Sequence, residues 1–93
     1  MNYAIAKLDI TDPEKLAAYR DVAGTALAKH GGAVVTASGD YTVLDGVPDT
    51  TGVTAILSFP DKASALAWAN DPDLADVHAL RRSAGASNIQ FLG

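Results

Sequence analysis

Residues 3–19 are YAIAKLDITDPEKLAAY, a strand pattern that passes directly into a helix pattern. Over residues 3–10 apolar side chains alternate with a mixed set, which is typical of a strand covered by helices on one face only. Thr11 suits the cap of the following helix, Pro13 fits a first helical turn, and Glu14 stands at capping-box spacing from Thr11. These residues predict a strand over 3–10 and a helix from about residue 13.

The glycine pair at residues 31–32 indicates where this helix stops, so we expect it to run to about residue 30. Two strand-like segments follow, at residues 33–38 and 41–45. The Gly-Asp pair at 39–40 fits either a bulge in one long bent strand or a hairpin turn. We favour the bulge, because a hairpin would give the sheet a fifth strand.

The second half of the chain repeats the order of strand and helix. Residues 53–59, VTAILSF, are nearly continuous in apolar character, as expected of a central strand. A helix is predicted over 61–70, and Asp71-Pro72 interrupts it because the residue before a proline avoids the α region. The helix resumes over 73–84, and a last strand is predicted over 87–92.

This order predicts one α+β domain over residues 1–93 with a ferredoxin-like βαββαβ fold. The handedness of strand–helix–strand crossovers places both helical segments on one face of a four-stranded antiparallel sheet. The other face measures about 400 Å² by strand dimensions, and we expect it to be mostly apolar, with Tyr3 and Ile5 on the first strand. A patch of that size is near the limit for a monomer, so we expect a homodimer formed through the sheet face.

Composition and charge exclude several classes of function. The net charge is −4, which disfavours nucleic-acid binding because phosphate contacts need a basic surface. The chain has no cysteine, and His30 and His78 lack metal-ligand spacing, so we expect no metal and no cofactor. No apolar run approaches the ~20 residues of a membrane span, and the N-terminal residues lack the signal-peptide pattern. We therefore expect a cytoplasmic protein.

Arg81 is the strongest candidate for a binding residue. It projects within the apolar stripe that Leu74, Val77, Leu80 and Ala84 form on the predicted helix over 73–84, so it should be buried. Arg82 should be exposed. A guanidinium on a core-facing stripe needs an acceptor, which is either the carboxylate of an acidic ligand or a structural partner such as an ion pair.

His78 and Trp68 are two further candidates for a ligand site. His78 lies at the edge of the same stripe, where it is either a general acid or base or a partly exposed helix residue. Trp68 either lines a pocket for a flat ligand or packs between helix and sheet. His30 ends the first helix, where it is either a general acid or base or a basic side chain that interacts favourably with the helix C-terminus. No catalytic residue can be assigned from these patterns.

Five segments together resemble the uncharacterised bacterial family DUF1330. They are YAIAKLDITDPEKLAAY at 3–19, KHGG at 29–32, VLDG at 43–46, ILSFPDKASALAWANDP at 56–72 and LRRSA at 80–84. The resemblance implies a dimeric α/β barrel of the ferredoxin-like superfamily. That superfamily contains monooxygenases, isomerases, haem enzymes and ligand-binding regulators, so the fold alone does not select a chemistry.

The combined hypothesis is a homodimer that binds a small organic ligand in a cleft between sheet and helices, with Arg81, His78 and Trp68 at the site. An enzyme acting on a small organic acid or aromatic compound is included in this hypothesis. The alternative is a structural or protein-interaction module that binds no ligand. A cavity reached by the three residues would favour the first, and a filled core would favour the second.

Overall fold

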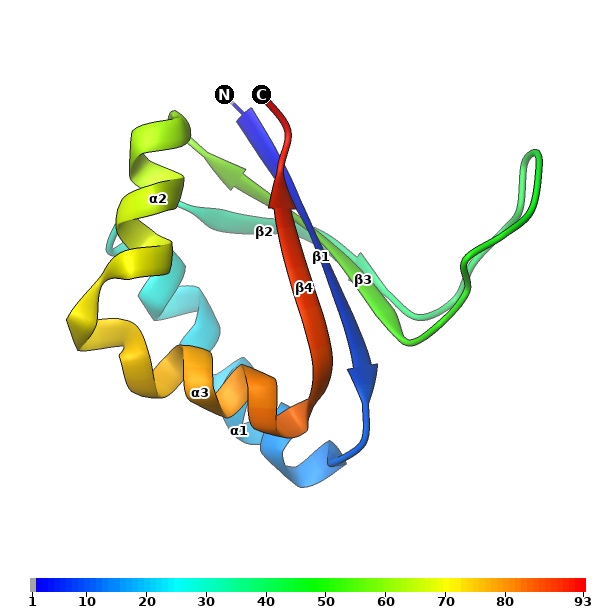
Figure 1. Ribbon diagram of the computed structural model, residues 1–93, viewed down its shortest axis with the longest axis horizontal. Coiled ribbons are helices and arrows are strands. Elements are labelled where there is room, and N and C mark those ends of the chain that lie inside the picture. Colours follow the sequence, from blue (N-terminus) through cyan, green and yellow to red (C-terminus); the bar gives the residue numbers. More distant parts are fainter. Residues whose placement is uncertain (1) are drawn as a thin grey trace.

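The computed structural model describes residues 2–93. Its elements are β1 (Asn2–Ile10), α1 (Pro13–Ala28), β2 (Ala33–Ser38), β3 (Val53–Phe59), α2 (Lys62–Asn70), the 3₁₀ turn η1 (Pro72–Leu74), α3 (Ala75–Ala84) and β4 (Gly85–Phe91). The strands form one antiparallel sheet in the order β2-β3-β1-β4 (Figure 1). This is the predicted α+β ferredoxin-like fold, which is therefore confirmed.

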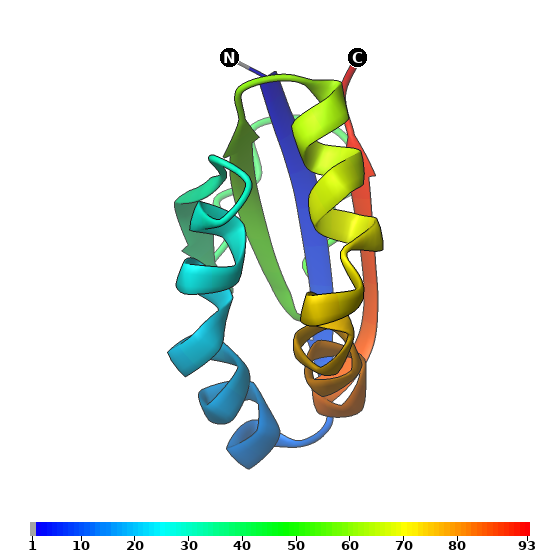
Figure 2. The same ribbon diagram turned by 90° about the vertical axis from the view of Figure 1, so that its left-hand side faces the viewer.

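All helices lie on one face of the sheet (Figure 2). Directly opposed residues of antiparallel strands point to the same face, so Ala4 shares the helix-covered face with Leu57 and Phe91. The largest fully buried side chains are Phe59 and Leu27. The core joins residues of the sheet and the helices, namely Ala4, Ala26, Leu27, Leu57, Phe59, Ala65, Trp68 and Leu74.

The helix boundaries follow the expected signals with small differences. Helix α1 begins at Pro13, but its cap is Asp12, whose carboxylate accepts a hydrogen bond from the Lys15 amide at 3.2 Å. Thr11 instead bonds to the carbonyl of Ala84, through its amide at 2.8 Å and its hydroxyl at 3.5 Å. These bonds fix the C-terminus of α3 beside the end of β1. The helix ends at Ala28, two residues before the predicted end.

The prediction of one long strand over 33–45 is wrong. Strand β2 ends at Ser38, and its register shift lies between Val34 and Thr36 rather than at residues 39–40. Residues 39–52 leave the sheet as an extended arm, seen at the right of Figure 1. A strand at 41–45 would need a partner beyond the start of β3, where Pro48 has no amide hydrogen to donate. Residues 41–45 therefore have no strand to pair with.

The base of this arm is held against the sheet. The Tyr41 hydroxyl donates to the carbonyl of Gly52 at 2.9 Å and lies 2.8 Å from the hydroxyl of Thr54. The Lys7 ammonium pairs with the Asp49 carboxylate at 3.2 Å and lies 5.4 Å from the centre of the Tyr41 ring. The outer residues Leu44 and Val47 are 94% and 98% exposed, so the apolar end of the arm makes almost no contact within its own chain.

The uncovered face of the sheet is less apolar than expected. The register places Tyr3, Ile5 and Ile56 on it as its large apolar side chains. Most other positions of this face are polar, namely Lys7, Thr54, Ser58, Thr36, Ser38, Asn88 and Gln90. The expectation of a mostly apolar open face is therefore wrong, because the polar residues of β3 and β4 alternate onto it.

Candidate functional site

Trp68, His78 and Arg81 meet in a buried cluster between the helices and the sheet, with 4%, 4% and 8% of their surfaces exposed. The Nε2 atom of His78 lies 2.9 Å from the carbonyl oxygen of Trp68, and Nη1 of Arg81 lies 2.8 Å from Nδ1 of His78. The rings of Trp68 and His78 meet edge to face at 4.7 Å. The structure thus brings together all three residues that the sequence analysis proposed for a ligand site.

The break at Asp71-Pro72 positions this cluster. Because the chain turns there through η1, Trp68 at the end of α2 faces His78 on α3. The Asp71 carboxylate accepts hydrogen bonds from Lys29 at 2.6 Å and His30 at 2.8 Å, which ties the turn to the end of α1. These bonds, with the Asp73 amide, hold the pKa of Asp71 well below its usual range. His30 therefore takes part in the contact between α1 and the turn at Asp71, and it lies outside the cluster.

His78 is buried in the cluster, so of the two alternatives considered for it, the partly exposed helix residue is wrong. The buried positions of this segment are Leu74, His78, Arg81 and Ala84, whereas Val77 is only half-buried. Burial of the imidazole is tolerated because the Trp68 carbonyl accepts its N–H. Since Nδ1 accepts from Arg81, the ring is neutral. Burial, followed by the charges of Arg81 and Arg82, lowers the pKa of His78 below 6.5.

Arg81 is buried and Arg82 is exposed, as predicted. The Arg81 guanidinium lies over the rings of Trp68 at 5.5 Å and Tyr19 at 5.8 Å, and its Nη1 is 3.5 Å from the Tyr19 hydroxyl. Within residues 2–93 no carboxylate pairs with it, so the structural ion pair considered for Arg81 is not formed. Its Nε and the Nε1 of Trp68 are buried donors that find no acceptor in the described part of the chain.

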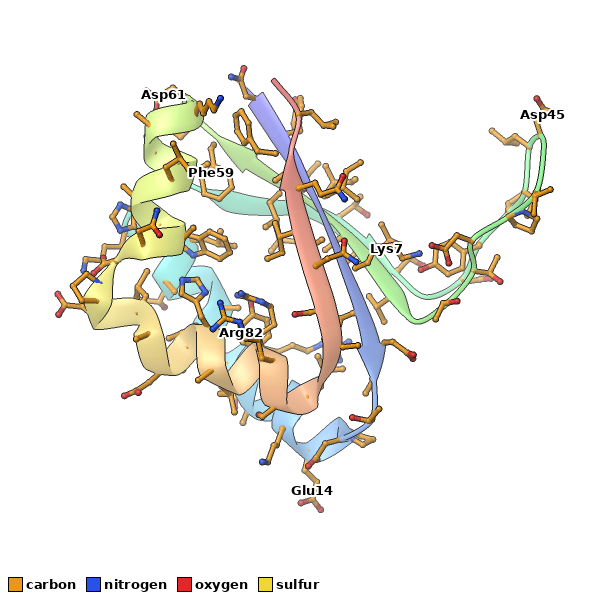
Figure 3. The ribbon with its side chains drawn as sticks, viewed as in Figure 1. Lys7, Glu14, Asp45, Phe59, Asp61 and Arg82 are labelled. Atoms are coloured by element: carbon orange, nitrogen blue, oxygen red, sulfur yellow. The ribbon has the colours of Figure 1, made fainter. Side chains whose placement is uncertain are left out.

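A cavity of about 410 Å³ opens beside the cluster, between α2, α3 and the β1–β4 side of the sheet. We call it the α2 cavity. Trp68, Phe59 and Phe91 give it flat apolar walls, and Lys62, Arg81 and Arg82 give it positive charge. Figure 3 shows the Arg82 side chain on the inner side of α3, in the space that α3 shares with β4.

A second cavity of about 310 Å³, the α1 cavity, lies between α1 and the sheet. Arg81 and Ile89 line both cavities, so the two spaces adjoin at the guanidinium. Arg20 also borders the α1 cavity, as does Lys7, whose ammonium is already paired with Asp49. All 11 acidic residues of the chain lie in the described part, and none of them lines either cavity. In a chain of net charge −4, both cavities are therefore suited to anions.

Sequence reasoning missed Lys62, Arg20 and the pairing of Tyr19 with Arg81. Lys62 stands in the first turn of α2 and Arg20 is exposed on α1, so both resemble ordinary exposed cations in the sequence. Tyr19 is separated from Arg81 by 62 positions. The signal for Arg20 was its place one residue after Tyr19 on the face of α1 that turns toward the sheet.

The fold and site define an α+β ferredoxin-like protein with a cationic cleft between its helices and its sheet. The sequence profile described as "Domain of unknown function (DUF1330)" matches residues 1–92, and the chain belongs to this family. The resemblance noted in the sequence is thereby confirmed. A comparison with curated proteins finds no match.

Solved structures with the same fold include three informative neighbours. A dimeric ferredoxin-like protein of unknown function from Jannaschia sp. CCS1 has a TM-score of 0.72 at 12% identity, covering 99% of this chain and 97% of its own. The RPA0582 protein of unknown function from Rhodopseudomonas palustris has a TM-score of 0.75 at 19% identity, covering 98% and 79%. SnoaB, a cofactor-independent oxygenase from Streptomyces nogalater in a mutant form, has a TM-score of 0.64 at 13% identity, covering 99% and 89%. At these identities the likeness establishes the fold alone.

Two further findings concern the described residues. Among residues 2–93, no helix is long and apolar enough to cross a membrane. Within the same range, no three His, Cys, Asp or Glu side chains come together in an arrangement that would hold a metal ion.

Proposed function

We propose that the protein binds a small organic anion in the cleft between sheet and helices, with Arg81 as the anchor of the negative group. The observation that carries this proposal is the buried Arg81 guanidinium, whose Nε has no acceptor and which no carboxylate neutralises within residues 2–93. A buried cation without a counter-charge is destabilising by several kcal/mol. A carboxylate or similar anion, bound to the part of the guanidinium that lines the cavities, would supply the missing counter-charge.

The other residues of the cluster have supporting roles in this proposal. His78 accepts a hydrogen bond from Arg81 and thereby fixes the direction of the guanidinium. Trp68 offers a flat wall and a free indole N–H to the ligand. Arg82 and Lys62 line the α2 cavity, no carboxylate of the described residues pairs with either, and both attract anions toward it.

A binding function is better supported than catalysis. A general acid or base at neutral pH needs a titrating group that is free to exchange a proton. Both ring nitrogens of His78 are already engaged, and its pKa is lowered. The alternative of a module without a ligand predicts a filled core, whereas cavities of about 410 and 310 Å³ adjoin Arg81. Volumes of this order are ordinary for ligand sites.

We also propose that the protein is a homodimer formed through the open sheet face. Tyr3, Ile5 and Ile56 form an apolar centre on that face, and polar side chains surround it, as in many interfaces. The exposed apolar end of the arm, with Leu44 and Val47, offers a second contact for the partner. The Jannaschia neighbour is described as dimeric, which supports the proposal.

The test is calorimetric titration and thermal unfolding with small carboxylates, phosphates and sulfonates. Binding should raise the unfolding temperature, because a ligand that binds only the folded state stabilises it. The Arg81→Met variant should lose this binding, whereas Lys15→Met, which removes an exposed cation outside both cavities, should retain it. If no anion binds the wild type, or if Arg81→Met binds as well as the wild type, the proposal is wrong.

A further inference from the structure

The α1 cavity differs in character from the α2 cavity. Its walls are largely aliphatic, and they include Leu8, Leu16, Leu27, Val53, Leu57 and Ile89. Arg81 is the buried polar side chain of this wall, and its exposed fraction is only 8%. The α1 cavity is therefore an apolar chamber with a single buried cation at the point where it adjoins the α2 cavity.

Small residues create this chamber. Ala23 and Gly24 stand where α1 crosses the sheet, and Ala6, Ala37 and Ala55 stand opposite them on β1, β2 and β3. A Cβ atom added at Gly24 would meet no other heavy atom within 4 Å, so close packing does not require the glycine. The space opens to solvent along one side, since Gly24, Val34 and Ala37 of its lining are exposed. The space is retained in the fold although larger side chains would fill it.

We infer that the ligand is an amphiphilic carboxylate, whose charged end binds Arg81 and whose aliphatic or aromatic body occupies the α1 cavity. This inference rests on the proposed function, since it takes the anion at Arg81 as given and adds the nature of the rest of the molecule. The part of the Arg81 guanidinium that lines this cavity provides the contact for the carboxylate. The aliphatic walls then select a molecule with an apolar body over a small polar acid.

The prediction is quantitative for a homologous series of ligands. Each methylene group transferred from water to an apolar site raises affinity by about fourfold. Straight-chain carboxylates from butanoate upward should therefore bind with affinities that rise about fourfold per carbon until the chamber is full. The corresponding alkanols should bind much more weakly, because they have no charge to place at Arg81.

Two matched substitutions distinguish the cavities. Ala23→Leu fills the α1 cavity, and Ala69→Leu places the same side chain in the α2 cavity. Ala17→Leu adds the same side chain to an exposed site on α1 that lines neither cavity, so it controls for folding and helix stability.

Titration calorimetry with butanoate, hexanoate, octanoate and decanoate measures the affinity of the wild type and the three variants for each chain length. We expect Ala23→Leu to lose at least tenfold in affinity for octanoate and to flatten the dependence on chain length, while butanoate binding changes little. Ala69→Leu and Ala17→Leu should keep the wild-type slope. A wild-type affinity that does not rise with chain length overturns the inference, and so does a slope that Ala69→Leu removes and Ala23→Leu does not.

The two proposals fail in different ways. If short and long carboxylates bind equally well through Arg81, the assignment of the α1 cavity is wrong and the anion site stands. If no carboxylate of any length binds, the inference is wrong, and the proposed function is wrong as well if phosphates and sulfonates also fail to bind. If alkanols bind as tightly as carboxylates of equal length, the chamber is apolar but Arg81 is not its anchor, which contradicts both.

Discussion

Replacing Arg81 with methionine should leave the stability of the ligand-free protein within about 2 kcal/mol of the wild type. Methionine keeps much of the length and apolar character of the arginine stem while it removes the buried charge. An unpaired buried ion carries a desolvation penalty of several kcal/mol, which the substitution removes. Against this gain, Nδ1 of His78 loses its donor, which costs about 1–3 kcal/mol, and two cation–π contacts are lost at about 0.5–2 kcal/mol each.

The gain and the losses are of similar size, so the balance predicts a change of no more than about 2 kcal/mol in either direction. Urea unfolding of ligand-free protein measures it, and the fluorescence of Trp68, the single tryptophan of the chain, reports the transition beside the site. Arg82→Met is the matched control, and it should stay within about 0.5 kcal/mol of the wild type because Arg82 is exposed.

A loss of more than about 2 kcal/mol in Arg81→Met would refute the reasoning, because such a loss is typical of a residue that the fold itself needs. Arg81 would then be a structural residue whose contacts with His78, Tyr19 and Trp68 hold α3 to α1 and α2. Gain or neutrality in stability, together with loss of ligand binding, is the combination typical of a functional charge that the fold holds at a cost.

The remaining predictions concern pH, the tie at Asp71, the oligomeric state and metal content. Because the pKa of His78 is lowered in the folded protein, the unfolded chain takes up a proton first, so the free energy of unfolding should fall as the pH drops below about 6.5. His78→Gln should remove this slope in urea melts at successive pH values, and a wild-type profile without the slope would contradict the assignment. Asp71→Asn should lower the urea midpoint, since Lys29 and His30 lose a shared acceptor, whereas the exposed Asp76→Asn should not. Light scattering should give about twice the 9.6 kDa mass of the chain and Ile56→Lys about one chain mass, and a monomeric wild type would contradict the proposed interface. Elemental analysis should find no stoichiometric transition metal, and a metal present at one per chain would show that prediction to be wrong.

The fold could be predicted from short local signals. The segment TDPE at 11–14, the glycine pair at 31–32 and the proline at 72 mark where helices begin, end or break, and each acts within a few residues of its own position. Helix ends depend on such neighbours, so they were predicted to within about two residues. The βαββαβ order then leaves few ways to arrange the sheet.

Features that depend on distant partners were harder to predict. Residues 41–45 have the composition of a strand, but a strand needs a partner, and the residues on the far side of the arm do not supply one. His78 has the sequence position of a half-exposed residue, yet the carbonyl of Trp68 accepts its N–H and allows it to be buried. Neither outcome follows from residues near it in the sequence.

The candidate site could be predicted only in part, because some of its features also depend on residues that are distant in the sequence. Helical periodicity predicted a buried Arg81 and an exposed Arg82, and the structure confirms both. The absence of a carboxylate around Arg81 within residues 2–93 and the two adjoining cavities depend on residues from α1, α2, α3 and the sheet together. The spacing of residues in the sequence does not predict which residues of the helices and the sheet surround Arg81.

The central claim is that Arg81 binds the charged end of a carboxylate ligand. Its most direct test is a crystal structure of the protein soaked with octanoate or another carboxylate that stabilises it. The account predicts electron density for a carboxylate oxygen within about 2.7–2.9 Å of Arg81, the distance of a charge-assisted hydrogen bond. Density for the ligand away from Arg81, or an Arg81 guanidinium paired with a carboxylate from a second copy of the chain, would contradict it.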